Sequence, residues 1–390
     1  MIDSTQEILA KSTNLWLEID REKIAQTWEK SQPFSSPQSR WRAYLNRICL
    51  DTIFPWLEAE ACTKPTIWQQ ESIYNSFWEF VNGSAINLGT KRLILVPSET
   101  IDTSEIRVPQ EWVDIPSWAG DYYLAIQVDT EAEIVQFVGY TTHLQLKQQE
   151  NYSSRDRTYS LDEEFLNQDL DLLMLGLEIC PEETTRKSLD SLPSLPQEQA
   201  NNLLTRLGNT EVAFPRRTVP FQLWGALLEH GGWRKILYQK RLGIQEQWSV
   251  FQWLKNGISE LPEQIGWRTF NLESLAGARG EITPAERPTI LSRKLVIAGQ
   301  EYELQISVSG TQEEPEAAFK LRNLALGGLI PEGFKLIILT EDLQPFEDNE
   351  DLATTAVEEL TIEVELEPGE GLVWETEPIP ENYDREILRF

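Results

Sequence analysis

The sequence contains little histidine, cysteine or methionine: its 390 residues include two histidines, three cysteines and two methionines. Histidine is the usual source of a base near neutral pH, so His143 and His230 are the two candidates for that role. We expect structural positions for both, His143 on a strand and His230 at the carboxyl end of a helix. Cys49, Cys62 and Cys180 share no close spacing, which is typical of free thiols in a reducing compartment. These features predict a cytoplasmic protein without a disulfide.

The common signatures of catalytic and cofactor sites are also missing. The sequence has no Cys-x-x-Cys, His-x-x-His or His-Glu-x-x-His pattern for zinc and no Gly-x-Ser-x-Gly nucleophile elbow. The segment Leu326-Gly-Gly-Leu329 lacks the spacing and the lysine of a phosphate-binding loop. We therefore expect no catalytic residue, no metal and no cofactor. Because 63 acidic residues guarantee chance pairs, an enzyme with a carboxylate-based site stays an alternative, as does a small-ligand sensor.

Long apolar runs and basic residues are scarce as well. No stretch approaches the roughly 18 consecutive apolar residues of a membrane span, and Met1–Ala10 is polar, so we expect neither insertion nor export. Lysine and arginine number 34 against 63 acidic residues, which gives a formal charge of −29. That charge repels nucleic-acid phosphates and favours a basic protein partner. The 14 tryptophans, 14 phenylalanines and 10 tyrosines supply ample apolar surface for a packed core.

The charge is unevenly distributed along the chain. The segment Glu341–Phe390 has 17 acidic residues and two basic ones, which leaves a charge of −15. Its densest part is the cluster Glu347, Asp348, Glu350 and Asp351, which lacks the central glycine and final glutamate of a calcium-binding loop. We interpret this cluster as a solvated acidic loop and a candidate interaction site.

One basic island interrupts this pattern. The segment Phe214–Arg241 has six basic residues and one acid, Glu229, and its candidate interaction residues are Arg216, Arg217, Arg234 and Lys235. The acidic segment and the basic island either dock on each other within the molecule or each contact a separate partner. Both alternatives stay open at the level of sequence.

The first part of the chain shows helical and then strand periodicity. A helix is predicted for Asp20–Lys30, capped by Asp20, and a second from Ser39, which Pro55 kinks or ends. Alternating residues over Tyr122–Leu146 predict an antiparallel hairpin. Ser160 and Glu163 are spaced as a capping box for a helix that reaches Leu177. This half is expected to consist of helices packed on an antiparallel sheet, as one domain over residues 1–180.

The second part of the chain is expected to contain two further domains. Residues 181–285 read as a linker and helical segment, with helices at Phe221–His230, Trp233–Leu242 and Trp248–Leu254 whose aromatic residues lie in the core. Residues 286–390 read as an acidic β-sandwich, immunoglobulin-like in architecture, with a hairpin around Ala298-Gly299 and alternating strands such as Ile362–Leu366. The fold class predicted for the whole chain is therefore α+β.

Five segments, in their order along the chain, carry a resemblance to a known family. They are Arg40-Trp-Arg-Ala-Tyr-Leu-Asn46, Tyr122-Tyr-Leu-Ala-Ile-Gln-Val128, Phe137-Val-Gly-Tyr140, Arg157-Thr-Tyr-Ser-Leu-Asp162 and Glu365-Leu-Glu-Pro-Gly369. Together they resemble the cyanobacterial domain-of-unknown-function family 1822 over most of the chain. The segments are structural, so no site residue is carried over from the family.

The resemblance implies a cyanobacterial cytoplasmic protein without established activity, from a family whose gene neighbourhoods contain caspase-like CHAT proteases and alternative sigma factors. It therefore suggests a non-enzymatic regulatory role, as an adaptor or inhibitor whose acidic tail covers the basic DNA-binding surface of a sigma factor. Opposite charge would give such an encounter its rate and selectivity.

Overall fold

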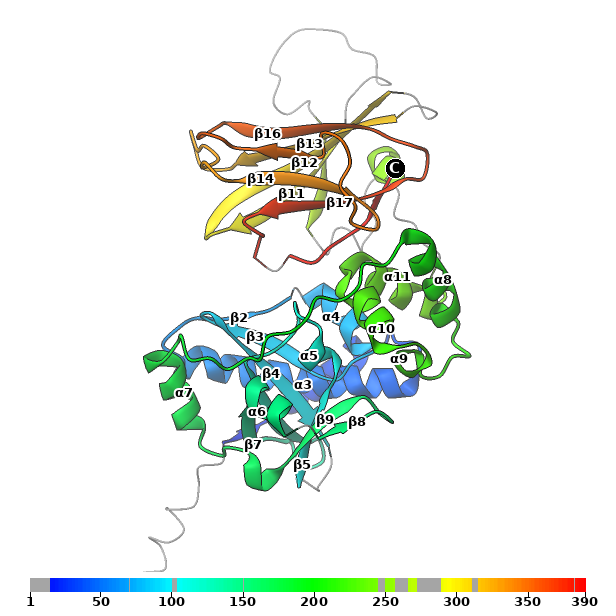
Figure 1. Ribbon diagram of the computed structural model, residues 1–390. Coiled ribbons are helices and arrows are strands. Elements are labelled where there is room, and N and C mark those ends of the chain that lie inside the picture. The colour runs from blue at the N-terminus through cyan, green and yellow to red at the C-terminus, as the bar shows by residue number, and fades with distance from the viewer. Residues whose placement is uncertain are drawn as a thin grey trace, which may run out of the picture. The chain divides into compact units, whose positions relative to one another are not determined.

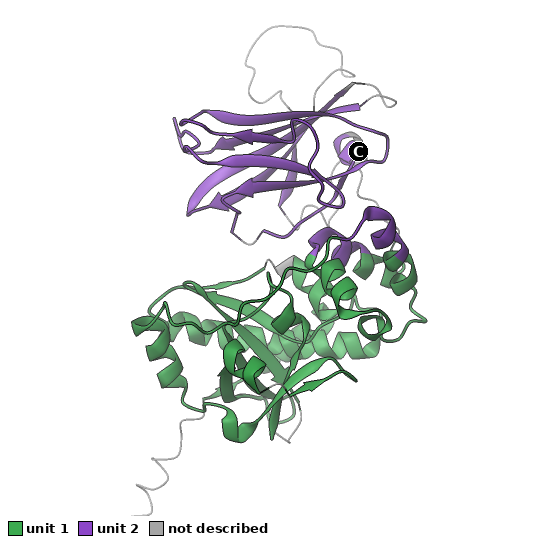
Figure 2. Cartoon of the chain, in the orientation of Figure 1, with its two compact units in different colours: residues 1–194, 203–229, 237–244 green, residues 195–202, 230–236, 245–390 purple. Residues whose placement is uncertain are grey.

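The computed structural model describes residues 15–69, 71–99, 104–149, 151–244, 250–256, 266–271, 289–310, 315–381 and 383–390. Its helices and strands form an α+β protein with several antiparallel sheets (Figure 1). The chain divides into two units, with residues 1–194, 203–229 and 237–244 in unit 1 and residues 195–202, 230–236 and 245–390 in unit 2 (Figure 2). The boundary expected at residue 180 lies within unit 1, and that at residue 285 lies outside the described residues. No helix in the described ranges is long and apolar enough to cross a membrane.

The main sheet of unit 1 has six strands. Their order across the sheet is β1 (Trp16–Glu18), β7 (Ile134–Thr142), β6 (Tyr122–Asp129), β4 (Lys91–Ser98), β3 (Ser84–Leu88) and β2 (Pro65–Ile67). The predicted hairpin is confirmed as β6 and β7, and the Asp129 carboxylate accepts the amides of Glu131 and Ala132 in its turn. β4 and β6 are parallel, so the sheet is mixed and not antiparallel throughout as predicted. A second, three-stranded sheet consists of β5 (Glu105–Pro109), β9 (Thr158–Asp162) and β8 (Tyr152–Ser153).

Helices pack on the main sheet of unit 1. The first, α2 (Arg21–Lys30), is capped as predicted by Asp20, whose carboxylate accepts the Glu22 amide. The long helix α3 (Pro37–Glu60) packs against β3, β4 and β6 and continues five residues beyond Pro55, where a kink or an end was expected. The remaining helices assigned wholly to unit 1 are α4 (Glu71–Trp78), α5 (Glu111–Asp114), α6 (His143–Gln148), α7 (Leu170–Ile179), α9 (Pro215–Thr218) and α10 (Phe221–Glu229).

Aromatic side chains fill the core of unit 1. Ring centroids lie 4.6 Å apart for Phe77 and Trp118 and 5.3 Å apart for Trp112 and Trp118, within the range of favourable aromatic pairs. Of the aromatic residues expected in the core of the middle helices, Trp224, Trp233, Tyr238 and Trp253 are buried, whereas Phe221 and Phe251 are half-buried. Trp248, at the start of the last predicted middle helix, lies outside the described residues, and the observed helix is α12 (Val250–Asn256).

Two local predictions in unit 1 are wrong. Ser160 does not open a helix but lies in β9, where alternating burial of its neighbours follows the two-residue period of a strand. A short 3-10 helix, η1 (Glu163–Phe165), follows β9, and the next α-helix, α7, begins ten residues after Ser160 with Asp169 as its cap, whose carboxylate accepts the Leu172 amide. His143 was predicted on a strand, but it opens α6, because the Thr142 hydroxyl accepts the Gln145 amide and ends β7 there.

Unit 2 contains two antiparallel sheets. The five-stranded sheet has the order β10 (Trp267–Asn271), β11 (Thr289–Ile297), β12 (Gln300–Gly310), β13 (Pro315–Asn323) and β16 (Glu359–Glu365). The four-stranded sheet has the order β15 (Glu350–Leu352), β14 (Lys335–Thr340), β17 (Gly371–Glu377) and β18 (Leu388–Arg389). The predicted hairpin turn is confirmed, since Ala298 and Gly299 both have positive φ between β11 and β12. In β16 the predicted alternation is also confirmed, with Ile362 buried and Glu363 exposed.

The glycine pair after α10 has a second function beyond ending that helix. Gly231 begins α11 (Gly231–Arg241), and an added Cβ would lie 2.5 Å from the Arg385 carbonyl oxygen. At Gly232 an added Cβ would lie 2.6 Å from the Ile387 side chain. These residues all belong to unit 2, so the glycines allow the chain around Ile387 to approach the helix closely.

Glycine-to-alanine substitution should have opposite effects at two helical positions. Gly231→Ala should lower the free energy of unfolding by about 2 kcal/mol, because backbone as well as side-chain atoms occupy the space of the new Cβ. Gly176→Ala, inside α7 with no atom within 4 Å of the added Cβ, should raise it by about 0.5 kcal/mol. Urea denaturation of both variants measures these changes. Equal stability of the Gly231→Ala and Gly176→Ala proteins would contradict the close approach.

Candidate functional site

Helix α7 in unit 1 exposes apolar side chains to solvent. Its buried side is made by Leu170 and Leu173. Leu172, Leu175 and Ile179 are 51%, 50% and 65% exposed, and their spacing of three and four residues places them along one face. The helix is therefore apolar on both sides, and only one of them is covered by unit 1.

A groove accompanies this exposed face. Its volume is about 360 Å³, and it is lined by the end of α3, the β3–β4 turn and α7, with Leu88, Met174 and Leu175 among its apolar walls. Cys62 lies in the same groove, where the Glu178 carboxylate raises the pKa of the thiol through a hydrogen bond and its negative charge. Cys62 is therefore held as a thiol, which argues against a nucleophilic role.

Acidic residues surround the exposed leucines. The segment Asp162–Thr185 contains eight acids and no lysine, arginine or histidine. Asp171 and Glu178 belong to α7 itself and are exposed. We define the α7 surface as Leu172, Leu175 and Ile179 together with Asp171 and Glu178. The charge imbalance and the leucine content of this segment were evident from the sequence. The capping box expected at Ser160 placed the start of the helix too early, so the exposed face of α7 was not predicted.

The predicted basic residues lie in two different units. In unit 1, Arg216 donates two hydrogen bonds to the buried Glu111 carboxylate at 2.6 and 3.0 Å, and the Arg217 guanidinium lies 4.3 Å from the Phe214 ring centre. In unit 2, Arg234 is buried and forms an ion pair with Asp384 at 2.5 Å. Lys235 is half-buried, and desolvation lowers its pKa to about 8 against the opposing charges of Glu386 and Asp384. Arg234 therefore meets a residue of the acidic segment within its own unit.

The predicted acidic cluster is divided between a loop and a strand of unit 2. Glu347 and Asp348 are exposed in the loop that precedes β15. Glu350 and Asp351 lie in β15, where Glu350 is 3.8 Å from the Lys335 ammonium and Asp351 accepts the Thr361 amide at 2.8 Å. Two members of the cluster thus support the sheet, and the other two extend into solvent.

Both histidines are held by main-chain contacts on each ring nitrogen. His143 Nε2 lies 2.9 Å from the Val113 carbonyl oxygen, and its Nδ1 accepts the Lys187 amide. His230 Nε2 lies 3.0 Å from the Glu341 carbonyl oxygen, and its Nδ1 accepts the Trp233 amide. Burial lowers the pKa of both rings, that of His230 to about 3. Each ring is therefore neutral and structural at pH 7.

Every buried carboxylate in the described residues forms an ion pair with an arginine. The pairs are Glu79–Arg241, Glu111–Arg216, Asp121–Arg186, Glu303–Arg322, Glu341–Arg389 and Glu386–Arg293. Hydrogen bonds to the charged form lower the pKa of Asp121 and Glu303 in spite of their burial. A carboxylate that acts as a general acid needs the opposite shift, so Asp121 and Glu303 are suited to structural roles.

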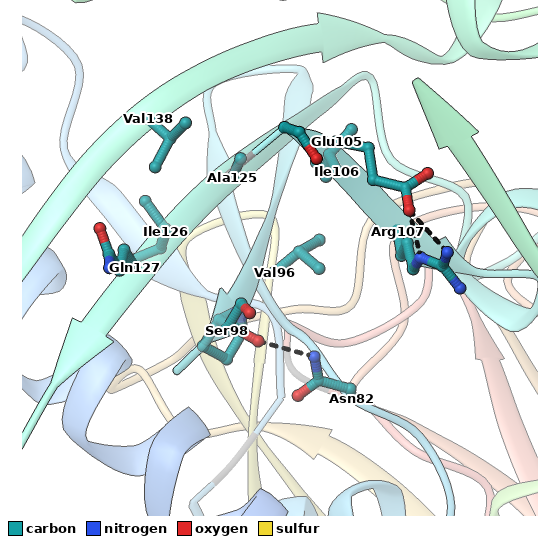
Figure 3. Close-up of a pocket in the computed structure, with 12 residues that line it drawn as sticks. Asn82, Val96, Ser98, Glu105, Ile106, Arg107, Ala125, Ile126, Gln127 and Val138 are labelled. Atoms are coloured by element: carbon teal, nitrogen blue, oxygen red, sulfur yellow. Dashed lines mark hydrogen bonds and ion pairs between the residues drawn. The ribbon is translucent and has the colours of Figure 1, made fainter. Parts of the chain in front are cut away.

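A cavity of about 310 Å³ lies on the main sheet of unit 1 (Figure 3). Val96, Ile126 and Val138 contribute apolar side chains, and Gln127 contributes an amide from β6. At its rim Arg107 forms an ion pair with Glu105 at 2.6 Å. Its size lies at the lower end of the range for small-molecule sites, and its lining combines apolar walls with few polar groups.

Comparison with known proteins gives one match. The family model described as "Protein of unknown function (DUF1822)" matches residues 17–389. No curated protein and no solved structure matches the chain.

Substitution of His230 should make stability less dependent on pH. The folded pKa is about 3, whereas an unfolded histidine titrates near 6.5, so only the unfolded state binds a proton between these values. The free energy of unfolding should therefore fall as the pH drops below about 6.5, by about 2 kcal/mol at pH 5 for this one ring. Urea denaturation of wild type and His230→Gln at pH 7 and pH 5 measures the difference.

The carboxylates serve as the internal control, since they titrate in both proteins. The His230→Gln protein should start from lower stability at pH 7 but lose less on acidification. An equal loss in the two proteins would show that the ring is not held neutral.

Proposed function

The chain belongs to the DUF1822 family of proteins of unknown function, and we propose that it is a non-enzymatic binding or regulatory protein for a basic protein partner. The α7 surface carries this proposal. Leu172, Leu175 and Ile179 offer an apolar ridge, and the segment Asp162–Thr185 has eight acids and no lysine or arginine. Lys91, which also lines the groove, is engaged by Asp121 at 3.8 Å. A partner that buries the leucines must place lysine or arginine beside them, because an uncompensated carboxylate at the rim of an interface opposes binding.

The shape of the surface favours a helical partner. A helix with an apolar stripe can lie along the groove beside α7 and cover Leu175 and Met174, while basic residues on its flanks face Asp171 and Glu178. The apolar contacts would supply most of the affinity, and the charges would supply encounter rate and selectivity. This division predicts an affinity that weakens, without vanishing, when salt is raised.

Unit 2 supplies a second negative surface in this proposal. Glu347 and Asp348 are exposed there, and Glu363 and Glu365 extend from the outer face of β16. The two antiparallel sheets are compatible with an immunoglobulin-like sandwich, an architecture that often presents binding loops. We propose that these carboxylates assist recognition of the same basic partner.

The family resemblance suggests which class of basic protein the partner belongs to. We propose an adaptor or inhibitor in the cytoplasm of a cyanobacterium, acting on an alternative sigma factor in a pathway linked to a CHAT protease. The basic, helical DNA-binding surface of a sigma factor has the chemistry that the α7 surface requires. Coverage of that surface would prevent the sigma factor from contacting DNA phosphates.

A second candidate is a small-ligand sensor, favoured by the cavity of Figure 3. A ligand of that site would place apolar groups against Val96 and Val138 and one polar group near Gln127. Substitution of Val138 by tryptophan would fill the cavity. A ligand that stabilises wild type but not Val138→Trp would favour this reading.

Substitution of the apolar ridge should weaken partner binding without unfolding the protein. Leu175→Asp combined with Ile179→Asp should lower the affinity for a purified alternative sigma factor at least tenfold, because both side chains belong to the ridge and are exposed in the free protein. Isothermal titration calorimetry at about 0.1 M salt measures the change. A matched control is Leu326→Asp, an exposed leucine in unit 2.

Three results would separate the parts of this proposal. Tenfold weaker binding by the double variant, with normal binding by the control, supports the α7 surface. Equal binding by both variants and wild type contradicts it. No binding of the sigma factor by wild type rejects that partner, and photo-crosslinking from position 175 would then identify the protein that contacts α7.

A further inference from the structure

A small cavity in unit 1 is lined by four arginines, although the chain as a whole carries a charge of −29. Its volume is about 90 Å³, the space of about three water molecules. Arg42 comes from α3, Arg216 and Arg217 come from α9, and Arg241 comes from α11. Arg42 and the other three arginines, at least 174 positions away in the chain, therefore bring their positive charges to one place.

The carboxylates nearby neutralise only half of this charge. Glu79, which also lines the cavity, is saturated by Arg241 at 3.2 Å and by the amide and hydroxyl of Ser35. Glu111 is engaged by Arg216 through two hydrogen bonds. Four guanidinium groups against two carboxylates leave a local charge of +2.

The other two arginines bring the uncompensated charge. Arg42 donates to the Trp78 and Glu79 carbonyl oxygens through Nη1, and Arg217 donates to the Arg155 carbonyl oxygen. Neither forms an ion pair within the described residues. Burial, and then repulsion by Arg216, lowers the pKa of Arg42 to about 10. An anion in the cavity would relieve that repulsion.

The start of α3 adds one amide donor to the same cavity. Ser36 caps the helix by accepting the Ser39 amide, and Pro37 has no amide hydrogen, so the Gln38 amide is the first-turn donor left for a ligand. The first turn contains no acidic side chain that would compete for that donor. The positive end of this 24-residue helix thus reinforces the arginines.

We propose that this cavity binds the phosphate group of a small molecule. Guanidinium groups match phosphate oxygens through paired hydrogen bonds. Arg216 and Arg241 are committed to Glu111, Glu79 and main-chain carbonyl oxygens, so Arg42 and Arg217 would supply those bonds. The volume holds one phosphate but not the rest of a larger ligand. The remainder of an ester would extend past Arg217, which lines the cavity and is exposed to solvent. The proposal is independent of the α7 surface, which lies on other elements of unit 1.

Titration of the full-length protein with inorganic phosphate tests the site directly. We expect saturable binding by isothermal titration calorimetry with a dissociation constant near or below about 1 mM. Arg217→Gln should weaken that binding at least fivefold without affecting the fold, because its side chain is exposed. Arg42→Gln should weaken it at least tenfold. Arg21→Gln, an exposed arginine of α2, is the matched control and should bind as wild type does.

Phosphoserine as a second ligand distinguishes a phosphate ester from the free ion. Tighter binding of phosphoserine indicates an ester whose remainder leaves the cavity, and exclusive binding of inorganic phosphate indicates an enclosed ion; both support the site. Absence of saturable binding up to about 10 mM phosphate overturns the proposal. The proposal would also be overturned if Arg217→Gln and Arg21→Gln weakened binding equally. If Arg42→Gln does not fold, Arg217→Gln alone still tests the site.

Discussion

The pairing of buried carboxylates with arginine is the interaction on which the rest of the structure depends. Burial of an isolated charge is prohibitive, and removal of one partner from a buried pair costs about 3–5 kcal/mol. Six buried carboxylates in the described residues meet this constraint in the same way, each with one arginine. Because the chain is acidic, arginines that pair with buried carboxylates leave fewer basic residues to neutralise the acids on the surface.

The consequence is a surface on which carboxylates prevail. Arg216 and Arg241 belong to the basic island of the sequence, but both neutralise buried acids of unit 1. Arg234 similarly pairs with Asp384 within unit 2. Few basic side chains are therefore left to neutralise the exposed acids around α7 and in unit 2, and a basic partner would complement the charge of such a surface.

Two places depart from this general pattern. At the α7 surface, apolar side chains that would ordinarily be covered are exposed among acids, which a partner with both apolar and basic groups would satisfy. At the cavity between α3 and α9, arginines exceed carboxylates, so the local charge is opposite to that of the chain. We propose a protein partner for the first feature and a small anion for the second, and each proposal can be tested without the other.

The sequence by itself determined the α+β class, the cap at Asp20, the hairpins at β6–β7 and β11–β12, and the alternation of β16. Each of these depends on neighbours within a few residues, so local periodicity and turn chemistry suffice. The family could also be identified from ordered segments of the chain.

Only the tertiary structure decided what the charged residues do. Arg216 was expected to be an interaction residue, and its pairing with the buried Glu111 depends on a contact over 105 positions. The parallel pairing of β4 with β6 also depends on contacts between residues far apart in the chain. So does the cluster of four arginines in the cavity, which come from three separate helices. Charge is counted along a sequence, but its compensation depends on distance in space, and for residues this far apart only the folded chain sets that distance.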